Sequence, residues 1–431
     1  MADNNSIRYY STNRNAPTVS FQEALFRGLA PDGGLYFPDR FPVFSAEELS
    51  NLPGSSLSEV AYQVLSKWFG DEIEDEAIRQ IAIDAQNFPI PMHKVGETHV
   101  LELTHGPTLA FKDVAAQNLP RLMSYFLQKD AKQIKLLVAT SGDTGGAIAH
   151  GFSDIPNIEV FVLFPKGRVS ALQEEQLTRV ADNIRPIEVD GVFDDCQAMV
   201  KQAFTDPALT HLSLTSANSI SIGRLIPQII YYVYVYAVLG RDDIQFIVPS
   251  GNFGNLTAGL FAREMGLPFN DFVAATNLND SAVRYIESTK YEPHETVSTL
   301  STAMDVGNPS NFARVLELFE HDYEALRDVI QAYRLDDEAT VATMRKVQDL
   351  YSYLLDPHTA VGWEITQEHG NPEMERVLIA TAAPVKFAHE IDRAAGITLD
   401  NSAEIDKLKA RPQRKTSIPN DYDALVQLLL K

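Results

Sequence analysis

Residues 134–146 read IKLLVATSGDTGG, an apolar run of β-forming residues followed at once by a glycine-rich turn. Such a run predicts a strand, and the helix-like residues after the turn predict that the chain continues as a helix. Apolar runs of this kind alternate with helix-like stretches at residues 134–139, 158–164, 184–189, 244–248, 271–275 and 377–380. The alternation predicts an α/β fold with a mostly parallel sheet.

Nearly every residue within these runs is apolar, whereas a strand with one face in water would alternate. We therefore expect helices on both faces of the sheet. In such folds ligands bind beyond the carboxyl ends of the strands, so the turns after the runs are where functional residues are expected.

The sequence predicts that the first 90 residues are mainly helical. Ser20–Glu23 and Ser45–Glu48 have the spacing of capping boxes, in which a hydroxyl and a carboxylate satisfy free amides at a helix start. We expect helices near residues 20–28, 55–69 and 72–86.

Acidic residues outnumber basic ones, with 58 Asp and Glu against 36 Lys and Arg in 431 residues, so the net charge is −22. This charge repels phosphate backbones and anionic lipids, and we expect neither a nucleic-acid nor a membrane partner. Cys196 is the only cysteine, which excludes an internal disulfide and a zinc–thiolate cluster. The histidines show no HExxH or paired ligand spacing, so we expect no metal.

The amino-terminal residues include Asp3 and lack the apolar core of a secretory signal, so we expect a cytoplasmic protein. The longest apolar run, IIYYVYVYAVL, covers residues 229–239. A membrane span needs about 20 residues, so this run predicts a buried helix or strand.

The turn TSGDTGG at residues 140–146 is the first candidate site. Its glycines admit backbone conformations that leave amides pointing at an anion, and the following helix start adds partial positive charge. By itself such a turn is either a structural element or a ligand site.

The second candidate is SGNFGN at residues 250–255, which follows the apolar run IQFIV. Its glycines and asparagines can present several amides to one phosphate-sized anion. The turn lacks the lysine of a Walker loop and the GxGxxG fingerprint of dinucleotide binding, so a small phosphorylated ligand is favoured.

The third candidate is HGPTLAFKD at residues 105–113, in which Lys112 follows Phe111 at a helix start. Most lysines are solvated, but burial lowers the pKa of an amine and makes it available for a Schiff base. A reactive amine and a phosphate cradle, without a metal or nucleotide signature, are what pyridoxal 5'-phosphate requires.

With three further segments, these motifs closely resemble the threonine synthase family in the expected order. The six segments are GLAPDGGLYFP (28–38), HGPTLAFKD (105–113), TSGDTGG (140–146), SANSISIGR (216–224), PSGNFGN (249–255) and LLDPHTAVG (354–362). The resemblance runs from about residue 7 to about residue 395.

The resemblance implies fold type II of the pyridoxal-phosphate enzymes, the tryptophan synthase β-like fold. That fold has two parallel-sheet α/β lobes, here joined to a mainly helical N-terminal domain. We place the N-terminal domain at residues 1–90, the large cofactor-binding domain at 91–130 and 216–431, and the small domain at 131–215.

The resemblance also implies roles for individual residues. Lys112 is expected to carry the cofactor as a Schiff base. The cofactor phosphate is expected at Gly251, Asn252, Phe253, Gly254 and Asn255. The substrate carboxylate is expected at Ser141, Gly142, Asp143 and Thr144, and the substrate phosphate at Asn218, Ser219 and Arg224.

Two positions concern the cofactor ring. Thr381 matches the hydroxyl residue that faces the pyridine nitrogen and leaves it essentially unprotonated. Asp143 is expected beside the ring, although many relatives have asparagine there. Where relatives read TAHP this chain reads TAAP at residues 381–384, so any role of that histidine is lost.

The implied reaction converts O-phospho-L-homoserine and water to L-threonine and phosphate, the last step of threonine biosynthesis. Lys112 removes the α-proton, and phosphate then leaves from Cγ toward Arg224, whose guanidinium can bind it with two hydrogen bonds. Domain closure is expected to exclude water.

Two other readings remain open. Another fold type II lyase or dehydratase, acting on serine-like or threonine-like substrates, would share the lysine and the phosphate loop. A cofactor-free binding module would keep the fold and be colourless when purified.

The resemblance favours a monomer over a dimer. His105 is more simply a turn-stabilising residue than a proton shuttle, and His358 has no task that its local sequence identifies.

Overall fold

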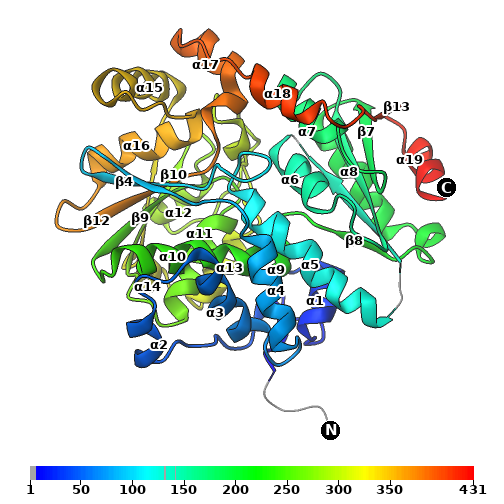
Figure 1. Cartoon of the computed structure of the whole chain (residues 1–431), viewed down its shortest axis with the longest axis horizontal. Helices are drawn as coiled ribbons and strands as arrows, with labels where there is room; N and C mark the ends of the chain where they lie inside the picture. The colour runs from blue at the N-terminus through cyan, green and yellow to red at the C-terminus, as the bar shows by residue number, and fades with distance from the viewer. Residues whose placement is uncertain (1–5, 131–132, 141) are drawn as a thin grey trace.

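The computed structural model describes residues 6–130, 133–140 and 142–431, which form two largely parallel sheets and a helical N-terminal region (Figure 1). In Figure 1 the six-stranded sheet lies on the left, the five-stranded sheet on the right and the N-terminal helices below. The fold class predicted from the sequence is therefore confirmed.

The N-terminal region pairs β1 (Tyr9–Ser11) with β2 (Tyr36–Pro38) in antiparallel fashion. Its helices are α1 (Phe21–Arg27), α2 (Ala46–Asn51), α3 (Leu57–Phe69) and α4 (Asp75–Ala85). Ser45 forms the full capping box with Glu48, and the Ser20 side chain accepts from Glu23 N. These caps fix the helix starts where the sequence placed them.

The six-stranded sheet has the order β11-β10-β9-β12-β4-β3 and is parallel except for the β3–β4 pair. Its strands are β3 (Met92–Val95), β4 (Thr98–Glu102), β9 (Ile244–Pro249), β10 (Asp271–Thr276), β11 (Ile330–Arg334) and β12 (Glu375–Ala380). Phe246 and Phe272 pack on one face, and Ile247 and Val273 on the other. Both faces are covered, which is why the central strands β9, β10 and β12 are mostly apolar.

Helices α10 and α11 cover one face of this sheet, and α15 and α16 cover the other. The helices of this part of the chain are α5 (Lys112–Asp130), α9 (Ile222–Leu225), α10 (Ile229–Leu239), α11 (Gly254–Glu264), α12 (Ser281–Ser288), α13 (Phe312–Leu318), α14 (Tyr323–Arg327), α15 (Asp337–Tyr351), α16 (Pro357–His369) and α17 (Ala388–Ala395). Short 3-10 helices are η2 (Ile226–Gln228), η3 (Thr302–Met304) and η4 (Pro384–Phe387).

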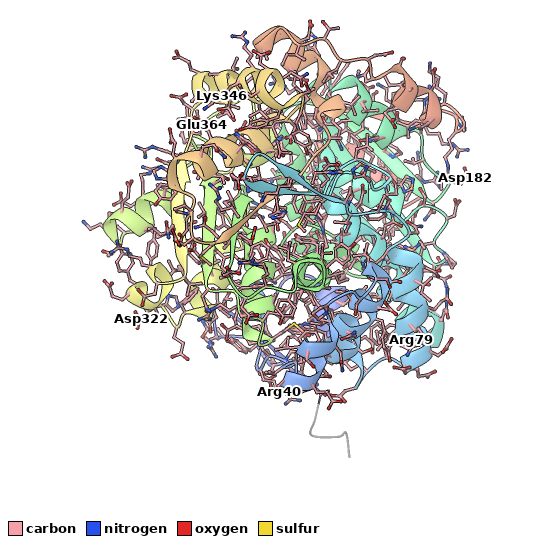
Figure 2. All side chains as sticks on the ribbon, turned by 60° about the vertical axis from the view of Figure 1, so that its left-hand side comes forward. Arg40, Arg79, Asp182, Asp322, Lys346 and Glu364 are labelled. Carbon is pink, nitrogen blue, oxygen red and sulfur yellow. The ribbon has the colours of Figure 1, made fainter. Side chains whose placement is uncertain are left out.

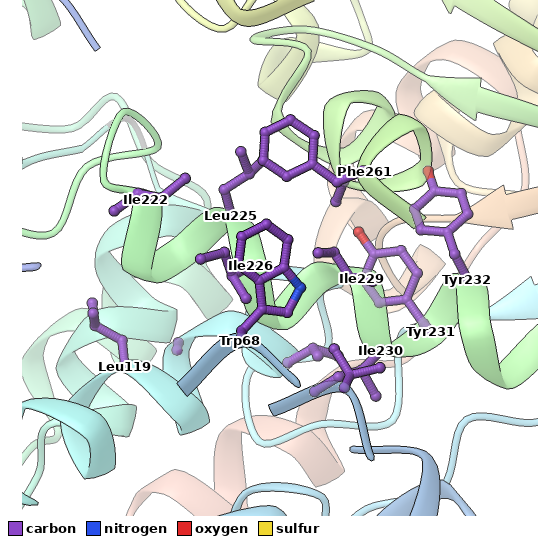
Figure 3. Close-up of a cluster of buried hydrophobic side chains, with 14 of the residues drawn as sticks. Trp68, Leu119, Ile222, Leu225, Ile226, Ile229, Ile230, Tyr231, Tyr232 and Phe261 are labelled. Atoms are coloured by element: carbon purple, nitrogen blue, oxygen red, sulfur yellow. The ribbon is translucent and has the colours of Figure 1, made fainter. Parts of the chain in front are cut away.

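The apolar run at residues 229–239 is helix α10, in the core of the protein. Figure 3 shows Tyr231 and Tyr232 of α10 beside Ile229, with Trp68 and Phe261 packed nearby. By length and composition the stretch Ile222–Leu239 could cross a membrane, but 78% of it is buried inside the protein. The prediction of a buried helix or strand is confirmed as a helix.

The five-stranded sheet has the order β13-β7-β6-β5-β8 and is parallel throughout. Its strands are β5 (Ile134–Ala139), β6 (Ile158–Pro165), β7 (Ile184–Asp190), β8 (Leu214–Ser216) and β13 (Thr416–Pro419). The accompanying helices are α6 (Asp143–Gly151), α7 (Ala171–Thr178), α8 (Phe193–Thr205), η1 (Pro207–Leu209), α18 (Ser402–Leu408) and α19 (Tyr422–Leu429).

The C-terminal strand β13 and helix α19 lie with the small sheet, although the sequence places residues 216–431 in the large domain. The physical reason is apolar cover: Ile418, Leu425 and Leu429 pack on Phe161 and its neighbours. Lys135 Nζ also donates to Leu429 O at 2.7 Å. The domain boundaries themselves stay a prediction.

Charged side chains lie mainly on the outside of the molecule, as Arg79 and Asp182 show at its edge in Figure 2. In the basic segment 407–415, Lys415 pairs with Glu174 and Glu188 at 2.8 and 2.7 Å. Arg411 pairs with Asp154 at 3.0 Å. This segment is therefore held to acidic groups of the small sheet.

Candidate active site

Three predicted site segments follow neighbouring parallel strands of the large sheet. β4 precedes the turn that leads to Lys112, β9 precedes Ser250–Asn255, and β12 precedes Thr381. Because the carboxyl ends of parallel strands share one edge, the three segments lie side by side there. Phe111 N donates to Thr381 O at 2.9 Å, which fixes Thr381 beside the lysine turn.

The turn before Lys112 folds around the buried carboxylate of Asp113. That carboxylate accepts from Thr108 N at 2.8 Å and from Thr108 Oγ1 at 2.6 Å. Leu109 has a φ of 60°, a conformation that non-glycine residues adopt only when their surroundings hold it. Burial raises the pKa of Asp113, while the Thr108 hydrogen bonds oppose the rise. The hydrogen bonds between Thr108 and Asp113 fix where the next helix begins, and they therefore fix the position from which the Lys112 side chain projects.

Lys112 is the first residue of α5, and its side chain is 13% exposed. Its Nζ lies 3.6 Å from Asp143 Oδ2 and 5.0 Å from the centroid of the Phe111 ring. Burial lowers the pKa of the amine, Asp143 opposes this, and the charges of Lys386 and Arg224 lower it further. The amine is thus more readily deprotonated than that of a surface lysine.

The glycine-rich turn after β5 brings Asp143 from the small sheet to Lys112. Gly142 has a φ of 144°, and a Cβ there would lie 2.5 Å from the Gln173 side chain. Asp143 and Thr144 open α6, where first-turn amides have no acceptor within the helix. Their dipoles favour an anion. Ser141, predicted to contact the same carboxylate, lies outside the described residues.

The loop after β9 is shaped by close contacts on both sides. A Cβ on Gly251 would lie 2.8 Å from Ala303 O, and Phe253 has a φ of 60° immediately before α11 begins at Gly254. Asn252 donates from Nδ2 to Ser219 Oγ, and its Oδ1 accepts from Ser310 N at 2.5 Å. The helix start therefore faces the segment predicted to hold the substrate phosphate.

Two tyrosines of α10 orient Asn255. The hydroxyls of Tyr231 and Tyr232 lie 2.7 and 2.8 Å from Asn255 Oδ1, so the carbonyl side of the amide is occupied. Asn255 Nδ2 is buried and has no hydrogen-bond partner among the described residues. A buried donor without an acceptor lowers the stability of the folded state. Asn255 Nδ2 lies at a helix start, where an anion would accept its hydrogen bond.

Arg224 lies on α9 and is 3% exposed. Nη1 donates to Ala217 O at 2.9 Å, while Nε has no partner and no carboxylate pairs with the guanidinium within the described residues. Burial lowers the pKa of Arg224 to about 10. The unpaired Nε of this buried guanidinium could donate to an anionic ligand.

The neighbouring predicted residues belong to a tightly bonded turn. Asn218 O accepts from Ser221 N at 3.0 Å, and Ser219 O accepts from Asn311 Nδ2 at 3.2 Å. Arg314, which is fully buried, donates from Nη2 to Ile220 O at 2.7 Å. The turn is thereby fixed against α13.

Two histidines now have observable partners. His105 Nε2 lies 2.6 Å from Glu102 Oε2 at a partly exposed position. His358 Nε2 accepts from Ala303 N at 3.0 Å, and its Nδ1 lies 2.7 Å from Asp356 Oδ1. His358 therefore holds the backbone that presses against Gly251.

Sequence reasoning missed several residues that build this site. Lys386, Arg314, Tyr231 and Tyr232 lie outside the quoted motifs or inside an apolar run. One signal pointed to two of them: the run at 229–239 contains four tyrosines, and the hydroxyl of any tyrosine buried there needs a hydrogen-bond partner. No group of three or more metal-ligating side chains occurs in the described ranges.

The fold and the site define an enzyme class that uses pyridoxal phosphate. Residues 93–380 match the family model described as "Pyridoxal-phosphate dependent enzyme". Residues 8–85 match "Threonine synthase N terminus", and residues 359–429 match "Threonine synthase, C-terminal".

The relatives narrow this class to one family. Threonine synthase of Escherichia coli is 39% identical over 98% of this chain and 99% of its own length. That of Haemophilus influenzae is 40% identical over 99% of this chain and all of its own length. The structure of pyridoxal-phosphate-bound threonine synthase from Brucella melitensis superposes with a TM-score of 0.93 at 37% identity, covering 98% and 99% of the two chains. The chain belongs to the threonine synthase family.

Proposed function

We propose that this enzyme converts O-phospho-L-homoserine and water into L-threonine and inorganic phosphate, with Lys112 as the catalytic amine. The observation that carries the proposal is the pair of unsatisfied buried donors, Arg224 Nε and Asn255 Nδ2. The charge of Arg224 acts on Lys112, and Asn255 follows a strand of the same sheet as the lysine turn. A substrate phosphate and a cofactor phosphate would satisfy one donor each.

The residues present fit pyridoxal phosphate. Gly251, Asn252, Phe253, Gly254 and Asn255 would hold its phosphate at the start of α11, where Asn255 Nδ2 offers a ready donor. Thr381 and Asp143 would border the ring. The bound group supplies an aldehyde for an amine and a conjugated system that spreads negative charge.

The chain's own residues would then divide the work on the substrate. Gly142, Asp143 and Thr144 present the helix start that would bind the substrate carboxylate. The resemblance adds Ser141 to the residues proposed for this carboxylate. Lys112 Nζ, whose pKa is lowered by burial, would take the proton from Cα.

Arg224 would bind the phosphate that leaves from Cγ, together with Asn218 and Ser219. A guanidinium can form two parallel hydrogen bonds to a phosphate, and burial strengthens them. Arg224 would thereby stabilise the charge that develops on the leaving group. Water adds at Cβ, so one water is consumed and one phosphate released for each threonine.

The direct test mixes purified protein, pyridoxal phosphate and O-phosphohomoserine, and measures threonine and inorganic phosphate. We expect equal amounts of the two products. Substantial turnover of plain serine, with turnover of O-phosphohomoserine unaffected by Arg224→Ala, would instead support a dehydratase.

Three further expectations belong to this proposal. We infer a monomer, which size-exclusion chromatography with light scattering would check, and a cytoplasmic location, which cell fractionation would check. We also propose the three domains given above, with residues 402–431 moved to the small domain because β13 extends its sheet.

A further inference from the structure

A second lysine, Lys386, lies next to the catalytic amine and belongs to none of the motifs. It is on η4, and its side chain is 0% exposed. Its Nζ lies 2.9 Å from Asp143 Oδ1, 2.5 Å from Thr108 O and 3.3 Å from Gln176 Oε1. An ammonium has three N–H donors, and three acceptors surround this one.

Asp143 stands between the two lysines. Its Oδ1 faces Lys386 and also accepts from Gln173 Nε2 at 2.9 Å, while its Oδ2 faces Lys112 at the longer distance of 3.6 Å. Burial raises the pKa of Asp143, but the charges of Lys386 and Lys112 outweigh it and hold the pKa well below its usual range. The carboxylate is therefore ionised and bonded more closely to Lys386.

This arrangement matters because a catalytic amine must lose its proton. A buried lysine paired with a carboxylate of its own would be held as an ammonium ion. The charged groups that face Lys112 are Asp143, Lys386 and Arg224, and Asp113 lies near Lys386. Among the described residues, two other cations, Lys386 and Arg224, thus act on Lys112 together with the carboxylate of Asp143, which could hold its proton.

We propose that Lys386 is a positioning residue that engages the charge of Asp143 and thereby leaves the amine of Lys112 free to react with an aldehyde. Lys386 also ties together parts that must meet at the site. It bonds Thr108 of the lysine turn, Gln176 of α7 and Asp143 of α6, and its own carbonyl accepts from Ser170 Oγ at 3.2 Å. The inference rests on the proposed role of Lys112.

The test measures how readily Lys112 reacts as a function of pH in the full-length protein freed of cofactor. Brief acetic anhydride labelling followed by mass spectrometry of the Lys112 peptide gives the midpoint at which the amine becomes reactive. Lys386→Met should raise this midpoint by roughly one pH unit, about a tenfold loss of free amine at a fixed pH. Asp143→Asn should lower it.

Opposite shifts are the signature of a charge effect, since a loosened site would move both variants the same way. The double variant should return close to the wild-type midpoint, and Lys386→Arg should stay close to it because the charge is kept. Lys346→Met is the matched control at an exposed position paired with Glu364 at 3.7 Å, and it should change nothing.

An unchanged or lowered midpoint in Lys386→Met, or a raised one in Asp143→Asn, would overturn the proposal. If Lys386→Met does not fold, Lys386→Gln replaces it. The shift in Asp143→Asn still shows whether the Asp143 charge raises or lowers the midpoint of Lys112. In the cofactor-loaded protein, the pH titration of the visible absorption band should move in the same directions. Labelling needs no substrate, so this outcome is separate from whether threonine is produced.

Discussion

Arg314, near the start of α13, and Arg224, in α9, are both buried, but they differ in how many of their guanidinium donors have hydrogen-bond acceptors. Arg314 donates from Nε to Tyr36 O at 3.0 Å, from Nη1 to Asn311 Oδ1 at 2.7 Å and from Nη2 to Ile220 O. Arg224 has one such bond, to Ala217 O, and its Nε is unpaired. Burial lowers the pKa of both, to about 9 for Arg314 and about 10 for Arg224.

The comparison distinguishes an arginine that stabilises the fold from one that is available to bind a ligand. Arg314, on α13, donates to acceptors in the N-terminal region, in the residue just before α13 and in the 219–220 turn, so it joins separate parts of the fold. Arg224 keeps donor capacity that the described chain does not use. Unused buried donors, rather than burial alone, therefore mark the position where a ligand is expected.

Removing Arg224 should give the largest change in activity. We expect Arg224→Gln to lower kcat/KM for O-phosphohomoserine by about 10³-fold, because the leaving phosphate loses its charged donor. The free energy of unfolding should change by less than about 1 kcal/mol, since only one hydrogen bond is lost. Steady-state kinetics and urea denaturation measure the two quantities. Equal activity in Arg224→Gln and wild type would remove the distinction between the two arginines.

Removing Arg314 should act mainly on stability. Arg314→Met would remove the Arg314 donor from three acceptors, and at about 1 kcal/mol or more for each we expect a loss of at least about 3 kcal/mol in the free energy of unfolding. Activity per folded molecule should fall far less than in Arg224→Gln, with KM rising as the 219–220 turn loosens. A stable Arg314→Met protein with no activity would show that this arginine also binds substrate.

Inorganic phosphate should distinguish the two positions without any catalysis. A ligand at 100 times its dissociation constant stabilises the native state by about 2.7 kcal/mol. We expect phosphate to raise the Tm of wild type and of Arg314→Met in cofactor-loaded protein, and to have much less effect on Arg224→Gln. Matched sulfate and chloride series control for ionic strength.

The smallest effect concerns the other unpaired donor. Tyr231→Phe should weaken binding of pyridoxal phosphate about fivefold, because it removes one of the two hydroxyls that orient Asn255 and is worth about 1 kcal/mol. Fluorescence titration of the cofactor-free protein measures the Kd. Tyr234→Phe, on the same helix and only partly buried, is the control and should leave the Kd unchanged.

Much of this fold could be predicted from sequence because its central strands are apolar on both faces. The runs at 134–139 and 244–248 lie within one residue of β5 and β9. The strands that were missed are short or at edges: β3 consists of the partly exposed four-residue sequence MHKV, and β13 has only Ile418 buried. Such strands are set by tertiary pairing and carry little pattern of their own.

The candidate site was predictable where its chemistry lies in contiguous motifs. The segments that contain Lys112, Asn255 and Thr381 follow adjacent strands, as the rule for parallel sheets requires. The role of Lys386 was not predictable, because it depends on an ion pair with Asp143, which is far away in the sequence. A lone lysine in APVKF has no local feature that distinguishes a buried ammonium from a solvated one.

The last strand, β13, has a consequence for biosynthesis of the chain. It pairs in parallel with β7 and forms the outer strand of a sheet whose other members all lie before residue 217. While the ribosome is still making the intervening residues, the backbone groups of β7 on that side have no neighbour, which is the condition under which strands join the wrong partner. Pairing of residues 416–419 with β7 supplies the missing neighbour and covers this edge of the small sheet.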